Sequence, residues 1–306
     1  MSDPSSGNFD PLNPPKRAVT VDVIVFTVAD GALWAVLTRR GSDPDDPFPG
    51  RLCLPGSFVG DDEELLQTAQ RVLHDKVGLS IDAERLSRSG VYDLPERDPR
   101  MRTISVAFTV LIAEHDHHEF IGLAKRRGDL HLVAQLLEDD AEMLAFDHQR
   151  ILIEAREHAG VLLEETNAAL DLLPPVFTLA QLRGVYDAVW GTELDPGNFI
   201  KRVTRIEGFL EQLPLESDRP GEFASAPTAP DAEWVEYRTD SYLKSFAPTE
   251  LPEEQSFERL SVLRPTASRG RPPRYFTAGG SRSLHPSLRR PGSYFSKPTR
   301  PSAPTD

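Results

Sequence analysis

"LPGSFVGDDEELLQTAQRVLHDKVGL", residues 54–79, carries the pattern that decides the fold. Apolar residues recur in it every three or four positions, which is the spacing of an amphipathic helix that buries one face. These residues are Leu65, Leu66, Ala69, Val72, Leu73 and Val77. We predict a helix over residues 61–77, with the four acids of residues 61–64 in its first turn, where the helix dipole favours negative charge. Gly78 is expected to end this helix.

Strand-like segments lie on both sides of this helix. "AVTVDVIVFTV" (18–28) and "TISVAFTVLIA" (103–113) are rich in β-branched residues and nearly continuously apolar, which predicts buried strands. Residues 32–40 predict a further strand, and the Pro and Gly content of residues 41–50 indicates a loop. Strands separated by helices favour an α/β sandwich, in which helices cover a sheet.

The second half of the chain is predominantly helical in pattern. The predicted helical ranges are 147–173, 177–191 and 193–212. Thr178 is placed to cap the second range and Gly191 to end it, while Asp195 is placed to cap the third before Pro196. Two short helices joined by a tight turn predict a helix-turn-helix.

Composition and charge limit the classes of protein. The chain has 306 residues, enough for about two domains. Its single cysteine, Cys53, excludes an internal disulfide and favours a reducing compartment such as the cytoplasm. No apolar run is long enough to span a membrane. The net charge of −14 combines −15 over residues 1–212, −8 over 213–258 and +9 over 259–306, so the basic end is able to bind phosphates.

Both ends of the chain are predicted to be largely disordered, with one short ordered segment near the C-terminus. Residues 1–17 have the composition of a disordered lead, and residues 213–256 of an acidic disordered insertion. Two short apolar pieces around a basic turn predict a β-hairpin within residues 257–280. We expect residues 281–306 to be a basic disordered tail.

The last predicted helix has a polar face suited to duplex DNA. Its polar side chains are Asn198, Lys201, Arg202 and Arg205, and its apolar side chains are Phe199, Val203, Ile206 and Leu210. A basic, exposed helix face fits the major groove, although an ordinary solvated helix has the same pattern. Arg269, Arg271 and Arg274 on the predicted hairpin favour the DNA hypothesis, because such a hairpin is able to reach phosphates.

Residues 57–79 resemble the signature of the Nudix hydrolases: Gly, five residues, Glu, seven residues, Arg-Glu-apolar-x-Glu-Glu-x-Gly-apolar. The matching residues are Glu63, Arg71, Leu73, Gly78 and Leu79. Ser57 replaces the opening Gly, and the three metal-binding carboxylate positions fall on Val72, Asp75 and Lys76. "LPG" before this box and "LPERDPRMRTISVAF" after it are also similar to Nudix domains, so the resemblance covers about residues 18–148.

The substituted box predicts no catalytic residue and no bound metal. Magnesium needs oxygen ligands; Val72 offers none, and Lys76 places positive charge where the metal would sit. We therefore expect no useful Nudix hydrolysis. A second cluster, at His115, His117 and His118, matches no standard zinc spacing, and no metal is predicted there either.

Other residues of the box and its surroundings suit a phosphate-bearing ligand. The expected ligand-binding residues are Arg39, Arg40, Phe58, Lys76, Arg100 and Arg102. Arginine suits bidentate phosphate contacts, Lys76 would pair with a phosphate, and Phe58 would stack on a base. The competing interpretation is a decayed scaffold whose arginines are surface ion pairs.

"LAFDHQRIL", "FTLAQLRGVYDAVWGTELDPGNFIKRV" and "GRPPRYF" resemble, in that order, the C-terminal part of the Nudix-related transcriptional regulators (NrtR). The resemblance implies a Nudix-like α/β/α sandwich (18–148) followed by a winged helix-turn-helix (149–212 plus 257–280). It also implies a homodimeric repressor of NAD metabolism genes, with an operator duplex as partner, ADP-ribose or a related nucleotide as effector, and no cofactor. The acidic insertion departs from the pattern, because it separates the wing from the last helix.

Two alternatives remain open at this point. One is an active pyrophosphohydrolase of ADP-ribose type, in which Glu63 or Asp75 recruits a metal. The other is a regulator that senses a sugar or another nucleotide.

Overall fold

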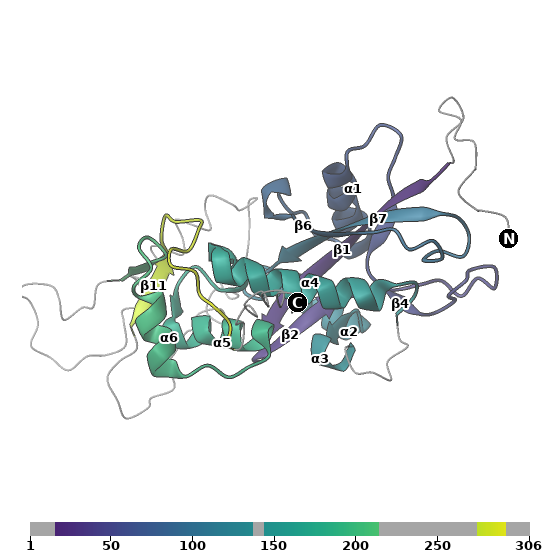
Figure 1. Ribbon diagram of the computed structural model, residues 1–306. Helices are drawn as coiled ribbons and strands as arrows, with labels where there is room; N and C mark the ends of the chain where they lie inside the picture. The colour runs from purple at the N-terminus through teal and green to yellow at the C-terminus, as the bar shows by residue number, and fades with distance from the viewer. Residues whose placement is uncertain (1–15, 137–143, 214–273, 292–306) are drawn as a thin grey trace, which may run out of the picture. The chain divides into compact units, whose positions relative to one another are not determined.

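A mixed six-stranded sheet forms the centre of the protein in the computed structural model, which describes residues 16–136, 144–213 and 274–291 (Figure 1). The sheet strands are β1 (Ala18–Ala29), β2 (Ala32–Val36), β5 (Gly56–Phe58), β6 (Ser87–Tyr92), β7 (Thr103–Leu111) and β8 (Leu130–Leu132). Their order is β6-β7-β1-β2-β8, and β5 pairs with the first half of β1. β1 runs parallel to β7, and the other pairs are antiparallel. The two strands predicted as buried therefore lie side by side.

One face of the sheet is covered by α1 (Leu65–Val72) and α2 (His118–Arg127). Alternate residues of β1 point to this face because side chains alternate along a strand; they are Val21, Val23 and Val25. Three residues of the predicted helical stripe, Ala69, Val72 and Leu73, are almost fully buried against them. The stripe read from the sequence is therefore confirmed.

The helix at residues 61–77 is shorter than predicted. α1 begins at Leu65, because Glu64 is extended and acts as N-cap in a reciprocal capping box with Gln67. The acids thus precede the helix instead of occupying its first turn. The helix continues as a π-helical turn over Leu73–Val77 and ends, as predicted, at Gly78, which adopts a left-handed φ of 80°.

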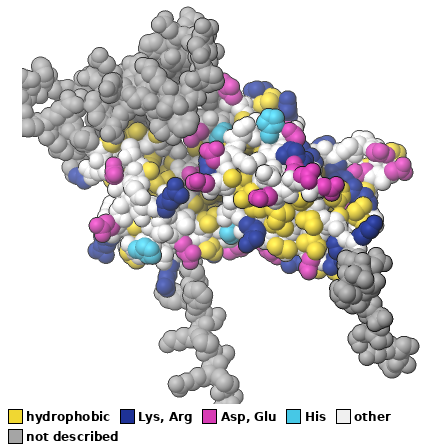
Figure 2. Space-filling view, turned by 90° about the horizontal axis from the view of Figure 1, so that it is seen from above, with side chains coloured by type: hydrophobic (Ala, Val, Ile, Leu, Met, Phe, Trp, Pro, Cys, Tyr) yellow, Lys and Arg dark blue, Asp and Glu magenta, His cyan; other side chains and the backbone are white. Residues whose placement is uncertain are grey.

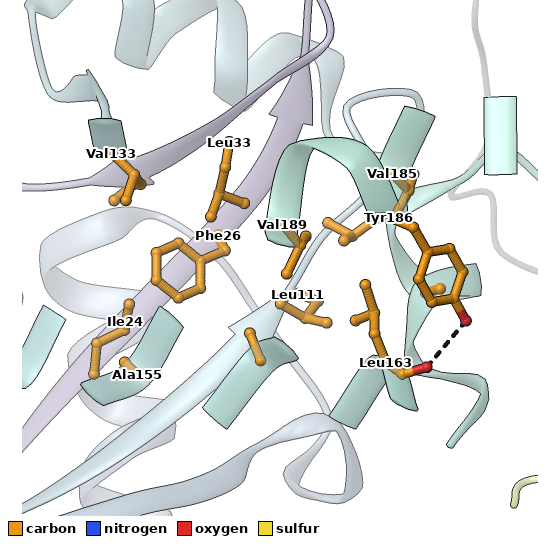
Figure 3. Packing of buried hydrophobic residues seen from close by; sticks show 14 of the residues in the cluster. Ile24, Phe26, Leu33, Leu111, Val133, Ala155, Leu163, Val185, Tyr186 and Val189 are labelled. Atoms are coloured by element: carbon orange, nitrogen blue, oxygen red, sulfur yellow. Dashed lines mark hydrogen bonds between the residues drawn. The ribbon is translucent and has the colours of Figure 1, made fainter. Parts of the chain in front are cut away.

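The opposite face packs against α4 (His148–Glu165) and α5 (Leu179–Trp190). Ile24 and Phe26 of β1 belong to the same buried cluster as Val185 and Tyr186 of α5 (Figure 3). The Tyr186 hydroxyl also donates a hydrogen bond to the Leu163 carbonyl of α4 at 3.0 Å. The two expected domains therefore share one continuous hydrophobic core through α4.

The predicted helix-turn-helix is present as α5 and α6 (Pro196–Val203). Thr178 caps α5 and a left-handed Gly191 ends it, while Asp195 accepts a hydrogen bond from the Asn198 backbone at the start of α6. A three-stranded sheet of order β10-β11-β9 accompanies these helices. Its strands are β9 (Phe177–Thr178), β10 (Leu210–Gln212) and β11 (Tyr275–Ala278). The first half of the predicted hairpin lies outside the described residues.

Three predicted elements are divided in the structure. The helix over 147–173 ends at Glu165, because Thr166 is extended and caps a separate 3-10 helix, Asn167–Leu172. The helix over 193–212 ends at Val203, and residues 210–212 form β10 instead. The strand over 32–40 splits into β2 and β3 (Thr38–Arg39), and β3 pairs with β4 (Leu52–Cys53) in a small sheet of its own. Local patterns did not mark these breaks.

The start of the predicted disordered tail is folded, so that prediction is wrong for residues 281–291. Leu284 and Leu288 are 1% and 2% exposed and belong to the main core. Their backbone N–H groups donate to the Glu165 and Glu164 carbonyls, at 2.8 Å each, which satisfies the last carbonyls of α4. The segment therefore serves as a cap on α4.

We expect Leu288→Ala to lower the free energy of unfolding by about 2–4 kcal/mol, because it leaves a cavity in the core. Urea denaturation measures this, with Leu123→Ala as the matched control, since Leu123 is 37% exposed on α2. Equal stability of the two variants would contradict the packing of this segment.

α3 (Val133–Leu136) and the 3-10 turn Ala83–Arg85 complete the described elements. Among the described helices, none combines the length and hydropathy needed to cross a bilayer.

Candidate functional site

A cavity of about 210 Å³ lies where β1, β5, the π-helical turn, the β6–β7 loop and the start of α4 meet. Four basic side chains line it: Arg40, Lys76, Arg97 and Arg100. Figure 2 shows basic and acidic side chains adjoining one another on the surface of the molecule, and the arginines of the cavity are likewise paired with carboxylates. The cavity is therefore a charged site, and Leu54, Phe58 and Phe146 form its apolar walls.

Buried ionic groups form its floor. Asp22, in the middle of β1, accepts a hydrogen bond from the Ser105 hydroxyl at 2.5 Å and lies 3.5 Å from the Arg97 guanidinium. Arg97 also binds both carboxylate oxygens of Asp147, at 2.8 and 3.1 Å. A side chain at position 56 would overlap the Asp22 carboxylate. Only glycine at this position therefore allows β5 to lie so close to Asp22.

His148, the first residue of α4, completes this floor. Its Nδ1 accepts the Leu54 backbone N–H at 2.9 Å, which leaves its hydrogen on Nε2, 3.6 Å from an Asp22 oxygen. Burial lowers the pKa of His148, so the ring is neutral near pH 7. The first turn of α4 is thus tied to β1 by polar contacts inside the cavity.

Phe146 forms one wall and is held in an unusual conformation. Its backbone φ is 58°, a left-handed value that bulky residues rarely adopt. The guanidinium groups of Arg40 and Arg100 lie 4.8 and 5.6 Å from its ring centre, and the Phe48 ring lies 4.7 Å away. Such outliers persist where surrounding structure enforces them, and they cluster at ligand sites.

Four of the six predicted ligand-binding residues line this cavity: Arg40, Phe58, Lys76 and Arg100. Arg39 and Arg102 do not. Arg39 points to the opposite side from Arg40, because successive side chains alternate along a strand, and it donates to the Gly50 carbonyl at 2.8 Å. Arg102 donates to the Asp93 carbonyl at 2.5 Å. Both guanidinium groups stabilise loops.

Sequence reasoning missed the floor and the Phe146 wall. Asp22 carried a readable signal, since a lone carboxylate within a β-branched buried strand needs a partner. Arg97 and His148 carried none, because their contacts with Asp22 join residues far apart in the chain.

A divalent metal does not fit the Nudix box positions. Val72 is 1% exposed in the core, and the Asp75 carboxylate points to solvent, where His74 binds it at 2.8 Å. Glu63 is held by Arg71 through two hydrogen bonds, at 2.6 and 2.7 Å, which lower its pKa to about 2. Lys76 projects into the cavity and donates to the Gly56 carbonyl. The described residues contain no cluster of three His, Cys, Asp or Glu side chains able to hold a metal.

The predicted DNA-facing residues of α6 are exposed, and the predicted apolar ones face the core. Asn198, Lys201, Arg202 and Arg205 are all exposed. Phe199, Val203 and Ile206 are buried, and Leu210 is partly buried in β10. Arg205 follows the end of the helix, and Arg202 donates to the Arg289 carbonyl at 3.1 Å.

Of the three arginines on the predicted hairpin, only Arg274 lies within the described residues. Arg274 is exposed and donates to the Gln212 side chain at 3.2 Å. Arg269 and Arg271 lie outside the described residues.

Comparison with known families matches both halves of the chain. A model of the NUDIX domain matches residues 16–146, and a model of the NrtR DNA-binding winged helix domain matches residues 169–222. The "ADPR responsive transcriptional repressor NtrR" of Acinetobacter baylyi is 30% identical over 200 residues, which cover 65% of this chain and 76% of that protein.

Two further relatives are an enzyme and a DNA-bound regulator. The "ADP-ribose pyrophosphatase" of Methanocaldococcus jannaschii is 32% identical over 109 residues, which cover 35% of this chain and 59% of that enzyme. The solved structure of Shewanella oneidensis NrtR, complexed with a 27mer DNA, is 26% identical, with a TM-score of 0.54 over 66% of this chain and 89% of that one. The pyrophosphatase match is confined to a shorter segment, whereas the NrtR matches span both halves. The chain therefore belongs to the NrtR family of Nudix-related transcriptional regulators.

Proposed function

We propose that this protein is a transcriptional repressor that binds operator DNA through α6 and responds to ADP-ribose, or a related nucleotide, in the cavity of its Nudix domain. NAD metabolism genes as targets, a homodimeric state and a cytoplasmic location belong to the same proposal. The observation that carries it is α4, which begins in the cavity at His148 and ends against the helix-turn-helix.

The chemistry of the cavity supports a nucleotide ligand. Arg40, Lys76 and Arg100 offer N–H donors for phosphate oxygens, and Phe58 and Phe146 offer rings on which a base would stack. A relative that is 30% identical is described as ADPR responsive, which supports ADP-ribose among such nucleotides.

The surface of α6 supports a DNA partner. Its exposed face is polar and basic, and its other face is buried against α5, where the Phe199 and Tyr186 ring centres lie 5.3 Å apart. This is the arrangement of a helix presented to the major groove by a rigid support. The Shewanella oneidensis relative was solved with DNA, which supports the same partner here.

The shared core supports coupling between the two sites. A ligand changes DNA affinity only if it binds two conformations of the protein with different free energies. Phe146, Asp147 and His148 place the first turn of α4 within reach of a ligand, and Leu163 at its other end contacts α5. A shift of α4 would therefore reach α6 through packed side chains.

We do not expect this domain to catalyse hydrolysis. Hydrolysis of a diphosphate in such a site needs a metal-activated water, and the box positions lack the carboxylates to hold the metal. The pyrophosphatase relative matches 109 residues, which are 35% of the chain, and its activity is not expected of this protein.

We expect ADP-ribose to change the affinity of the protein for a DNA fragment selected from a random pool, while the same preparation hydrolyses no ADP-ribose at an ordinary enzyme rate with magnesium or manganese. Gel shift and phosphate release measure the two properties. Unchanged DNA affinity would remove ADP-ribose as the effector; brisk hydrolysis without DNA binding would restore the enzyme alternative.

A further inference from the structure

Lys76 differs from the other basic residues of the cavity in having no carboxylate partner among the described residues. Each lining arginine forms an ion pair with an acid: Arg40–Asp46, Arg97–Asp147 and Arg100–Asp98. Lys76 has a hydrogen bond to the backbone carbonyl of Gly56 and no ion pair in the described parts of the chain. Its positive charge is thus the least compensated in the cavity.

The position of this ammonium group is one that a metal ion would otherwise use. Lys76 occupies a carboxylate position of the Nudix box, and backbone carbonyls such as that of Gly56 are ligands that hard cations accept. An ammonium group on that carbonyl repels a second cation, because two like charges at contact distance are unfavourable.

The carboxylates that do line the cavity are already engaged. Asp22 accepts from Ser105 and lies against Arg97, and Asp98 accepts two hydrogen bonds from the Arg100 guanidinium. The positive charge that a diphosphate requires must therefore come from the protein itself.

We propose that the Lys76 ammonium takes the place of the divalent cation, so that the cavity binds a nucleoside diphosphate ligand without metal. This inference rests on the proposed function, since it concerns how the same site recognises its effector. A lysine is suited to this role, because its compact charge and three donors can bridge the Gly56 carbonyl and a phosphate oxygen. It also explains why loss of the metal acids need not abolish ligand binding.

Isothermal titration of the full chain with ADP-ribose, in EDTA and in magnesium, tests the inference. We expect the wild-type dissociation constant to agree in the two buffers, and Lys76→Met to raise it about tenfold in both, the effect of losing one charge-assisted hydrogen bond. Lys76→Arg should keep most of the affinity. Lys76→Glu should bind poorly in EDTA and regain affinity in magnesium, because it recreates a metal ligand.

Lys125→Met is the matched control, because Lys125 lies on α2 away from the cavity lining, and it should leave the affinity unchanged. Wild-type binding that requires magnesium would overturn the inference but leave the proposed effector in place. Normal affinity of Lys76→Met would also overturn it. Absence of ADP-ribose binding in both buffers would contradict the proposed function, and the inference with it.

Discussion

Replacing Arg97 by methionine is expected to lower the free energy of unfolding by about 3–5 kcal/mol, the largest stability loss that we predict. Arg97 is 7% exposed and is the guanidinium shared by Asp22 and Asp147. Its removal leaves two carboxylates close together at the floor of the cavity without their common cation. Chemical denaturation, followed by far-UV circular dichroism, measures the loss.

Two further variants separate this cause from a simple loss of side-chain volume. Asp22→Asn combined with Arg97→Met should recover part of the stability, because one uncompensated charge has been removed along with its partner. Arg150→Met is the matched control, since Arg150 and Glu154 form an exposed pair whose contribution is about 0.5 kcal/mol or less. A loss for Arg97→Met no larger than that of the control would show that the buried network does not hold the first turn of α4.

The elements with strong local signals were predicted correctly from the sequence, although for α6 this holds only for its start. β1 and β7 are continuous β-branched runs, and α5 and the start of α6 carry their own caps at Thr178 and Asp195. In each case the residues that determine the element lie within it, so a periodicity and a cap suffice.

The folded start of the tail shows where composition misleads. Residues 281–291 are rich in Ser, Arg and Pro, which indicates disorder, yet Leu284 and Leu288 are anchored in the core by contacts with α4. Nothing within the segment reveals this, because the partners of both leucines lie more than a hundred positions earlier.

Only part of the candidate site was predicted, because some of its residues meet through contacts between distant parts of the chain. Lys76 was identified because it stands at a box position, Arg40 and Arg100 because arginine suits phosphate contacts, and Phe58 because its ring would stack on a base. The network at the floor joins Asp22 to Arg97 and His148, a meeting that only the three-dimensional fold creates. The polar contacts that join the first turn of α4 to the cavity floor could therefore not be predicted from motifs.

The double variant Lys201→Ala/Arg205→Ala is expected to weaken DNA binding on the order of a hundredfold at low salt. Both side chains are exposed on or just after α6, where they would meet the backbone of a duplex. Each lost phosphate contact weakens binding and reduces the slope of log affinity against log salt by about one, so the slope should fall by about two. Fluorescence anisotropy over a salt series, with a fragment selected by the wild-type protein, gives both quantities.

Lys125→Ala/Arg127→Ala is the matched control for this variant, because it removes the same charges from the exposed end of α2. A non-specific effect of net charge would weaken binding equally in the two double variants, whereas contacts from α6 would affect only the first. Titration with ADP-ribose in the absence of DNA should give the same affinity for both, since neither pair lines the cavity. Equal DNA affinity and an unchanged salt slope for the α6 variant would place the DNA-binding surface on another part of the protein.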